Sequence, residues 1–398
     1  MEVVVVLEHR FNCTPDGFVW TQVTCPYSFW MRYLEVFDRV RVVARILEVP
    51  SVLPGWKRAD GEGVSFTAIP YYLGPWQYLL KARQVRLAAR NAVGVNDAVI
   101  MRVSSSIANC IEPLLHETGH PYGVEVVADP YDVFAPGSVK HPLSPFFRWW
   151  FPQQLRRHCA GACAAAYVTE GALQRRYPPP STAFSTHYSS VELPASALVA
   201  APHLPHQNAR QFTLIFVGTL AQLYKAPDVA IAAVAACVRE GLDLQLIVVG
   251  DGKHRPELEA QAKALGIGGR VCFRGQLTAG DSVRAQLDRA DLFILPSHQE
   301  GLPRAMIEAM ARSLPCIGST VGGIPELLPP EDIVPPGDAT ALANKIREVV
   351  TNPERMTRMS ARNLEKAKDY RDEVLQERRN QFYRYVREMT EKWLREKK

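Results

Sequence analysis

The sequence has 398 residues, of which 47% are hydrophobic and 22% charged, with a formal net charge of +5. This length allows two domains with separate cores, and the composition is ordinary for a soluble globular protein. No apolar run reaches the roughly 18 residues that a membrane-spanning helix needs. The mild basic excess fits anionic small ligands or a membrane surface and is too diffuse for a nucleic-acid-binding protein.

The apolar opening, MEVVVVLEH, is short and has no basic start, so it predicts a buried strand rather than a signal peptide. Eight cysteines are scattered through the chain, and most lie in apolar segments. Cys159 and Cys163 are one helical turn apart, without a second ligand pair nearby. We therefore expect reduced core cysteines in a cytosolic protein.

Short apolar segments alternate with amphipathic helical patterns, which is typical of parallel α/β architecture. In the first half, strands are predicted at residues 2–8, 39–46, 97–104, 123–130 and 164–170. Residues 196–211 are rich in Pro, Ala and His without periodicity, and predict a linker near residue 200.

A second alternating series begins at Phe212. It predicts helices at residues 227–240 and 256–265, and strands at 212–218, 244–250, 270–275, 292–297, 315–319 and 332–336. We therefore expect two doubly wound domains, residues 1–200 and 201–371, with the ligand at the carboxyl ends of the strands, in the cleft between the domains. Residues 372–398 predict one amphipathic helix, whose apolar face must dock on the first domain or on a partner.

Residues 116–120, His-Glu-Thr-Gly-His, match the HExxH pattern of zinc proteases. Such a site needs both histidines on one helical face and a third ligand from elsewhere. Pro121 directly follows His120, so we expect the helix to end at Gly119 and His120 to leave it. No third-ligand motif follows. We predict no metal site and keep a zinc metalloprotease as the most distant alternative.

Residues 297–328 carry a more informative pattern, SHQEGLPRAMIEAMARSLPCIGSTVGGIPELL. Pro303 predicts the first position of a helix with a buried stripe formed by Met306, Ile307, Met310 and Leu314. The loop before it leaves unpaired N–H groups at the helix N-terminus, which favour an anion such as a diphosphate.

Two glutamates mark this segment: Glu300 precedes the helix and Glu308 lies within it. Because a carboxylate accepts paired hydrogen bonds from vicinal hydroxyls, one glutamate can hold a ribose and the other a sugar. Solvated surface acids are the alternative. The apolar strand before the segment and GGIPE after it favour a cleft position.

The segment resembles the Glu-x7-Glu motif of the retaining family 4 glycosyltransferases, which have the GT-B fold of two Rossmann-like domains facing a central cleft. FVGTLAQLYKAPDVAIAAV resembles the family's glycine-to-lysine turn, VVGDGKHRPELEAQAKALGIGGRVCFRGQL its strand-helix-strand unit, and STVGGIPELL its closing loop. The resemblance is specific over residues 212–345 and only topological in the first half. It also implies that the C-terminal helix crosses back to the first domain.

The resemblance implies a role for each matching residue. Lys225 would neutralise the donor diphosphate, and Gly218 would let the backbone approach it. Glu300 would contact the transferred sugar, and Glu308 would bind the nucleotide ribose. Further donor contacts are expected from Thr219, Arg274, Gly301, Leu302 and Pro303.

This sequence departs from the family pattern at three positions. Thr219 stands where many relatives carry arginine, and the usual Lys-Gly pair is Lys225-Ala226. The first-domain histidine that often touches the donor sugar is missing from VVADPYDVF, where Asp129 is the nearest polar residue and becomes a catalytic candidate beside Lys225 and Glu300.

Other first-domain residues are weaker candidates. Asp16-Gly17 either faces the diphosphate or forms a simple exposed turn. Arg102 and Ser104 follow a predicted strand and are further cleft candidates. Residues 144–158 place aromatic beside basic side chains, and predict either contact with an anionic membrane surface or a buried helix with a basic edge, interrupted by Pro152.

The sequence thus predicts a cytoplasmic, retaining hexosyltransferase that uses a nucleotide-diphosphate sugar, UDP rather than GDP, without a cofactor. The acceptor would be a hydroxyl of a polysaccharide, a glycolipid or a small glycoside, and peripheral contact with the inner face of the membrane is a further expectation. No metal is implied, because Lys225 and the helix dipole replace it. A sugar-nucleotide-binding protein without transfer activity is the alternative.

Overall fold

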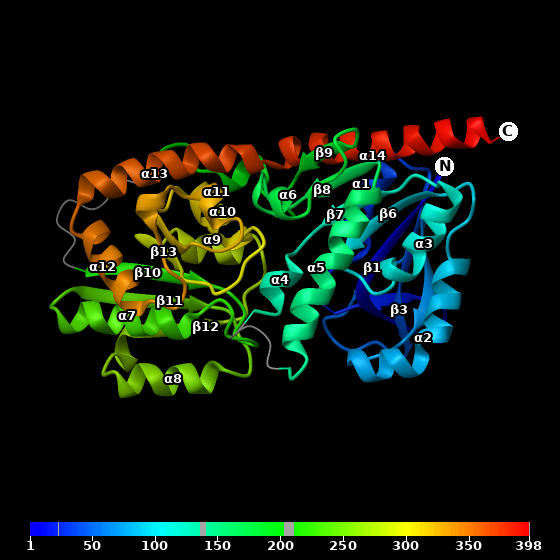
Figure 1. Ribbon diagram of the computed structural model, residues 1–398. Helices are drawn as coiled ribbons and strands as arrows, with labels where there is room; N and C mark the ends of the chain where they lie inside the picture. The colour runs from blue at the N-terminus through cyan, green and yellow to red at the C-terminus, as the bar shows by residue number, and fades with distance from the viewer. Residues whose placement is uncertain (23, 136–140, 203–210, 398) are drawn as a thin grey trace. The chain divides into compact units, whose positions relative to one another are not determined.

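The computed structural model describes residues 1–22, 24–135, 141–202 and 211–397 (Figure 1). The chain forms two compact α/β units. Unit 1 comprises Met1–Ala128, Trp149–Tyr188 and Gln376–Lys398, and unit 2 comprises Asp129–Arg148 and Ser189–Leu375. Part of the predicted linker, residues 203–210, lies outside the described residues.

Unit 1 is built on a nine-stranded sheet whose parallel strands run in the order β5-β3-β1-β6-β7-β8-β9. These strands are β1 (Glu2–Cys13), β3 (Arg39–Glu48), β5 (Val64–Pro70), β6 (Ala98–Val103), β7 (Gly123–Val126), β8 (Ala164–Tyr167) and β9 (Phe184–His187). Two short strands, β2 (Val19–Thr21) and β4 (Lys57–Arg58), extend the end of β1 in antiparallel pairing. All five strands predicted for this half are present.

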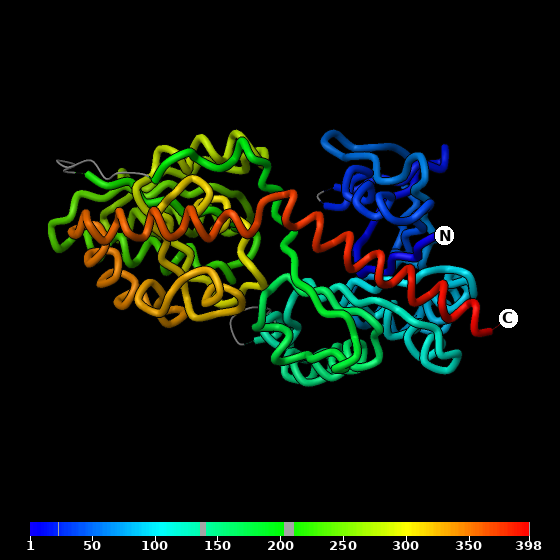
Figure 2. The backbone as a smooth tube through the Cα atoms, turned by 90° about the horizontal axis from the view of Figure 1, so that it is seen from above, coloured from blue at the N-terminus to red at the C-terminus, as the bar shows by residue number. Residues whose placement is uncertain are grey.

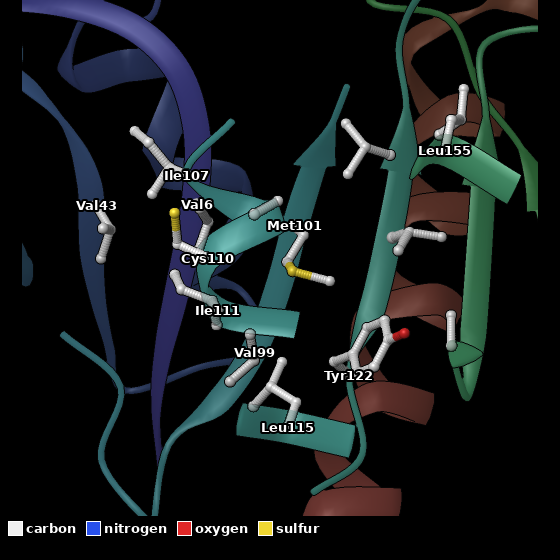
Figure 3. Close-up of a cluster of buried hydrophobic side chains, with 14 of the residues drawn as sticks. Val6, Val43, Val99, Met101, Ile107, Cys110, Ile111, Leu115, Tyr122 and Leu155 are labelled. Atoms are coloured by element: carbon white, nitrogen blue, oxygen red, sulfur yellow. The ribbon is translucent and has the colours of Figure 1, made fainter. Parts of the chain in front are cut away.

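The first half of the chain contains six helices in the described residues, of which α4 and the start of α5 belong to unit 2. They are α1 (Tyr27–Leu34), α2 (Gly74–Asn91), α3 (Ala108–Thr118), α4 (Pro130–Val133), α5 (Ser144–Gly161) and α6 (Ala172–Arg176). Figure 3 shows the core, where Ile111 and Leu115 of α3 lie over Val6 of β1 and Met101 of β6, all of them buried. The sequences of these strands are nearly continuous apolar runs, because both faces of a parallel sheet are buried.

Unit 2 contains a six-stranded parallel sheet in the order β12-β11-β10-β13-β14-β15. Its strands are β10 (Gln211–Val217), β11 (Asp243–Val249), β12 (Val271–Gly275), β13 (Leu292–Leu295), β14 (Cys316–Ser319) and β15 (Ile333–Val334). The chain adds β11 and β12 on one side of β10 and then returns to add β13, β14 and β15 on the other. All six predicted strands are present, and the direction of winding reverses between β10 and β13.

The helices of unit 2 connect its strands or follow the last of them. They are α7 (Pro227–Arg239), α8 (Arg255–Ala264), α9 (Asp281–Leu287), α10 (Arg304–Ala311), α11 (Ile324–Leu327), α12 (Ala339–Val350) and α13 (Pro353–Ala367). Short 3-10 turns lie at η1 (Ala195–Ala197), η2 (Gly268–Arg270), η3 (Pro330–Asp332) and η4 (Lys368–Tyr370). The predicted helices at 227–240 and 256–265 match α7 and α8 to within one residue at each end.

The last helix, α14 (Asp372–Glu396), starts in unit 2 and continues as part of unit 1. Figure 2 shows its C-terminal part, in red, running along unit 1 between segments coloured blue and cyan. Its side chains Phe382 and Val386 are fully buried there. A Cβ at Gly123 of β7 would come within 2.8 Å of Phe382 and 2.7 Å of Val386, so glycine is required where α14 crosses the sheet.

A buried carboxylate fixes α14 to unit 1. Glu125 of β7, 2% exposed, accepts hydrogen bonds from the hydroxyls of Tyr33 (2.9 Å), Tyr188 (2.7 Å) and Tyr383 of α14 (3.2 Å), and forms an ion pair with Arg102. Burial raises the pKa of the Glu125 carboxyl. Arg102 and the tyrosine hydroxyls together lower this pKa by more than burial raises it, so the net shift is downward. Arg102 therefore belongs to this internal network.

This network predicts an acid-dependent loss of stability. The pKa of Glu125 is below its ordinary 4.5 in the folded state, so its stabilisation is complete above that pH and is lost as the pH falls through the lower folded value. Urea unfolding should show that Glu125→Ala, which leaves the mostly buried Arg102 without its carboxylate partner, costs about 3–5 kcal/mol at neutral pH. The difference from wild type should shrink in acid. Glu388→Ala on the exposed face of α14 is the control; a pH-independent difference would contradict the assignment.

Candidate active site

Unit 2 brings Lys225 and Glu300 together at the reversal point of its sheet. β10 and β13 are direct neighbours, yet the chain leaves them toward opposite sides of the sheet. Lys225 lies in the segment that follows β10, and Glu300 lies in the segment that follows β13. In open parallel sheets this reversal at the carboxyl ends of two adjacent strands is where ligands bind.

The two side chains form an ion pair. Lys225 Nζ lies 2.7 Å from Glu300 Oε1, and the Glu300 side chain is only 7% exposed. The hydroxyl of fully buried Ser297 donates to the same oxygen at 2.8 Å, and Ser319 Oγ donates to the Ser297 carbonyl oxygen at 2.6 Å. Glu300 Oε2 has no hydrogen-bond partner within the described part of the chain. One carboxylate oxygen is thus held in place while the other can accept from a ligand hydroxyl.

Gly218 makes the approach of Lys225 possible. A Cβ at Gly218 would lie 2.4 Å from Lys225 Cδ, so a side chain there would displace the lysine. Gly250, at the end of β11, has φ 137, and a Cβ there would come 1.8 Å from the Gly218 carbonyl oxygen. The two strand ends therefore pack backbone against backbone. The sequence pointed to Gly218 as a phosphate neighbour, but the need for Gly250 was not foreseen.

The residue after Lys225 has an unusual backbone conformation. Ala226 is fully buried and adopts φ 55 and ψ 50, in the left-handed region, immediately before Pro227 opens α7. This conformation costs a non-glycine residue roughly 1–2 kcal/mol. The departure from the family's Lys-Gly pair thus places alanine where the backbone favours glycine.

The backbone of residues 300–302 packs closely against Gly322 and Gly323. Gly323 N donates to the Gly301 carbonyl oxygen at 2.6 Å, and a Cβ at Gly322, which has φ 54, would come 1.9 Å from the Glu300 carbonyl oxygen. Among the hydrogen bonds of the described residues, none uses the N–H of Gly301 or Leu302 as donor. These two donors precede α10 and are available to an anion.

The structure corrects the predicted start and end of this helix. Pro303 has an extended backbone, φ −74 and ψ 105, and is the N-cap of α10 rather than its first helical residue. α10 ends at Ala311, so Leu314 is buried beyond the helix rather than within it. The stripe of Met306, Ile307 and Met310 is fully buried, as predicted.

Glu308 lies within α10 and is partly buried. Burial raises the pKa of its carboxyl, while Arg304 and Arg284 lower it, and the net direction is upward. Its carboxylate makes no hydrogen bond or ion pair with any residue that the structure describes. A half-buried carboxylate without an internal partner is suited to accept hydrogen bonds from a bound polyol.

The remaining candidates have individual surroundings. Thr219 Oγ1 accepts from Ala221 N at 3.1 Å and closes the turn after β10. Arg274 is exposed on β12, one residue before Gly275. Asp129 is the N-cap of α4, where its Oδ1 accepts from Tyr131 N at 2.9 Å, and it begins the first segment of unit 2.

In unit 1 the corresponding reversal point, between β1 and β6, is occupied by a side chain of the protein. Glu8 lies where the register of β1 shifts, and its Oε2 accepts from Ser106 N at 2.8 Å and Ser105 Oγ at 3.0 Å, directly before α3. Gly17, with φ 86, lies in the exposed turn between β1 and β2. The role of Glu8 was not foreseen from the sequence.

The HExxH segment does not form a helical histidine pair. α3 ends at Thr118 and Gly119 is its left-handed C-cap with φ 65, which confirms the predicted end. His120 N donates to the Leu115 carbonyl oxygen at 2.9 Å, and its ring packs 4.4 Å from the ring of Trp393. Within the described ranges, no group of three or more His, Cys, Asp or Glu is arranged to hold a metal ion.

Over part of its length, the chain is similar to known glycosyltransferases. Residues 211–352 match the family described as "Glycosyl transferases group 1". Protein CapJ of Staphylococcus aureus is 26% identical, over 81% of this chain and 80% of its own length. N-acetyl-alpha-D-glucosaminyl L-malate synthase of Bacillus anthracis is 34% identical, but over only 37% of this chain and 39% of its own.

Solved structures match along the whole chain. Sucrose-phosphate synthase from Thermosynechococcus elongatus has a TM-score of 0.66 at 16% identity, covering 97% of this chain and 99% of that one. Anabaena Alr3699/HepE in complex with UDP and glucose has a TM-score of 0.60 at 15% identity and full coverage of both chains. The predicted GT-B fold of two parallel-sheet α/β domains is therefore confirmed.

The conformation of Ala226 yields a stability prediction. Ala226→Gly should relieve the left-handed strain, partly offset by a more flexible unfolded chain, and leave unfolding free energy unchanged or raised by up to about 1 kcal/mol. Ala233→Gly, at a fully buried position inside α7, should lower it by about 1 kcal/mol. Urea unfolding of the two variants beside wild type makes the comparison; equal losses in both would contradict the assigned strain.

Proposed function

We propose that this protein is a retaining glycosyltransferase that moves a sugar from a UDP-sugar to a hydroxyl acceptor without a metal ion. The observation that carries the proposal is the Lys225–Glu300 pair at the reversal point of the unit 2 sheet, with Glu300 Oε2 and the N–H groups of Gly301 and Leu302 unused by the described chain. These groups offer a cation and two backbone donors for a diphosphate, and a carboxylate for sugar hydroxyls.

The proposed donor site divides into three parts. Lys225 and the backbone donors ahead of α10 bind the diphosphate, whose charge the helix N-terminus also favours. Glu300 accepts from hydroxyls of the transferred sugar through its free oxygen. Glu308, which lacks an internal partner, accepts from the ribose. The uracil-type base would contact backbone groups near Arg274, and the likeness to a protein solved with UDP and glucose supports this choice of base.

The proposed reaction breaks the bond between the anomeric carbon and the diphosphate oxygen. The acceptor oxygen attacks from the face that the diphosphate leaves, and its proton passes to the departing diphosphate. Lys225 and the backbone N–H groups stabilise the negative charge that develops on the leaving group, so the site works mainly by positioning and electrostatics. Asp129, whose Oδ1 accepts from Tyr131 N, stays a candidate for contact with the sugar.

The acceptor is proposed to be a polysaccharide, a glycolipid or a small glycoside, bound by residues of unit 1 in the cytoplasm. The alternative is a protein that binds sugar nucleotides without transferring the sugar. Release of UDP from a UDP-sugar in the presence of acceptor extracts separates the two, because a binding protein returns the donor unchanged.

Nucleotide binding tests the proposed donor. Thermal unfolding with UDP, GDP or ADP, with chelator present throughout, should show stabilisation by UDP, about 2.7 kcal/mol at 100 times the dissociation constant. Glu308→Ala should remove most of this shift, because the ribose loses its carboxylate. Glu354→Ala, at a side chain 92% exposed on α13, is the matched control and should behave as wild type. Stabilisation by none of the nucleotides would refute the proposed donor site.

A further inference from the structure

Helix α2 of unit 1 has two apolar faces. Its inner face packs on α3 and β5, with Val85 and Ala89 fully buried and Tyr78 partly buried against the core. A surface helix with one such face normally presents polar side chains on the other. Here the outward face is apolar as well.

The outward face carries four large exposed side chains: Trp76 (72% exposed), Leu79 (61%), Leu80 (87%) and Leu87 (63%). At about 100° per residue they fall within one sector of roughly 100°, opposite Val85. Single exposed leucines are ordinary on protein surfaces, but several large apolar side chains on one face, including a tryptophan, mark an interaction surface. In Figure 1, α2 lies at the outer edge of unit 1, and within the described chain these four side chains are exposed.

The charges of α2 are of one sign. The helix contains Lys81, Arg83, Arg86 and Arg90 and no acidic residue. Lys81 donates to the Tyr71 carbonyl oxygen. Arg90 lies 3.7 Å from Glu117 of α3. Arg83 lies within the same sector, between Leu80 and Leu87, and Arg86 lies at its edge; both are exposed and form no ion pair with any residue in the described ranges.

We propose that the outward face of α2 docks on an anionic membrane surface. Trp76 and the three leucines would enter the boundary between headgroups and acyl chains, while Arg83 and Arg86 contact anionic headgroups. The purely basic charge of α2 favours an anionic membrane over a second copy of this protein, because two copies of this face would bring arginines against arginines. The inference is independent of the proposed donor site.

This surface differs from the segment 144–158 that the sequence singled out. There α5 is continuous through Pro152, which is buried, rather than interrupted. Its aromatic rings pack on one another, with the Trp149 and Trp150 centroids 6.1 Å apart and those of Phe146 and Phe147 5.7 Å apart. None of the described helices is long and apolar enough to cross a membrane, so docking through α2 would be peripheral.

Vesicle co-sedimentation of the full chain tests the proposal. The protein should pellet with vesicles of phosphatidylcholine mixed with phosphatidylglycerol, less with phosphatidylcholine alone, and less at high salt. Arg83→Glu with Arg86→Glu should lower partitioning by roughly fivefold or more for each charge lost. Leu79→Glu with Leu80→Glu should lower it by about tenfold or more, because buried apolar area is replaced by charge.

Two controls separate docking from general surface effects. Leu53→Glu removes another exposed leucine of unit 1 (56% exposed), and Arg358→Glu reverses an exposed arginine of unit 2 (70%); both should partition as wild type. Unchanged thermal unfolding should accompany every variant, since exposed substitutions shift stability by about 0.5 kcal/mol or less. If the Leu79/Leu80 variant unfolds early, the single Leu80→Ser replaces it.

Two results would overturn the proposal. One is absence of binding to anionic vesicles by wild type, or equal binding by wild type and the α2 variants. The other is a wild-type dimer, seen by light scattering, that the Leu79/Leu80 variant converts to monomer, because a second copy would then cover the face.

Discussion

The ion pair between Lys225 and Glu300 is the interaction around which unit 2 is arranged. Two charges that are mostly removed from water are tolerable only when each has a partner in good geometry. Lys225 and Glu300 are 75 positions apart in the sequence. They lie close together because β10 and β13, which they follow, are neighbours in the sheet. Gly218 leaves room for the lysine, and Ser297 holds the carboxylate oxygen that the lysine contacts.

The reversal points of the two sheets differ in which groups they leave available to a ligand. In unit 2 the reversal point of the sheet keeps unused donors and a free carboxylate oxygen ahead of α10. In unit 1 the Glu8 carboxylate fills the matching position before α3, accepting from Ser105 and Ser106. Glu8 Oε1 also pairs with Arg45 at 3.3 Å, so groups of the protein itself fill this position in unit 1. This contrast supports the assignment of the diphosphate to unit 2.

Most strands and helices could be predicted from the sequence, because apolar periodicity and glycine or proline positions depend only on neighbouring residues. The unpredicted strands are of two kinds: β2 and β4 have three and two residues, while β5 and β9 carry a weak apolar pattern. The end of α3 at Gly119 was also predictable, because Pro121 restricts the residue before it.

The site was predictable only in part. The resemblance pointed to Lys225 and Glu300 as separate ligand contacts, but nothing local shows that they pair, since that depends on strand order. Ser297 and Glu8 act through hydrogen bonds that only the folded chain creates. The left-handed backbone of Ala226 could not be predicted, because alanine gives no sequence signal for that conformation. The exposed apolar side chains of α2 could be recognised as a surface only once their exposure was known.

Calorimetric titration with UDP and UMP tests the central claim that Lys225 holds the diphosphate. Wild type should bind UDP more tightly than UMP, and Lys225→Met should abolish that preference. Glu308→Gln should weaken both nucleotides by the same factor and leave the ratio intact, because ribose is common to both. Comparing ratios within each variant removes any effect on stability. A UDP preference that survives in Lys225→Met would contradict the account and place the terminal phosphate elsewhere.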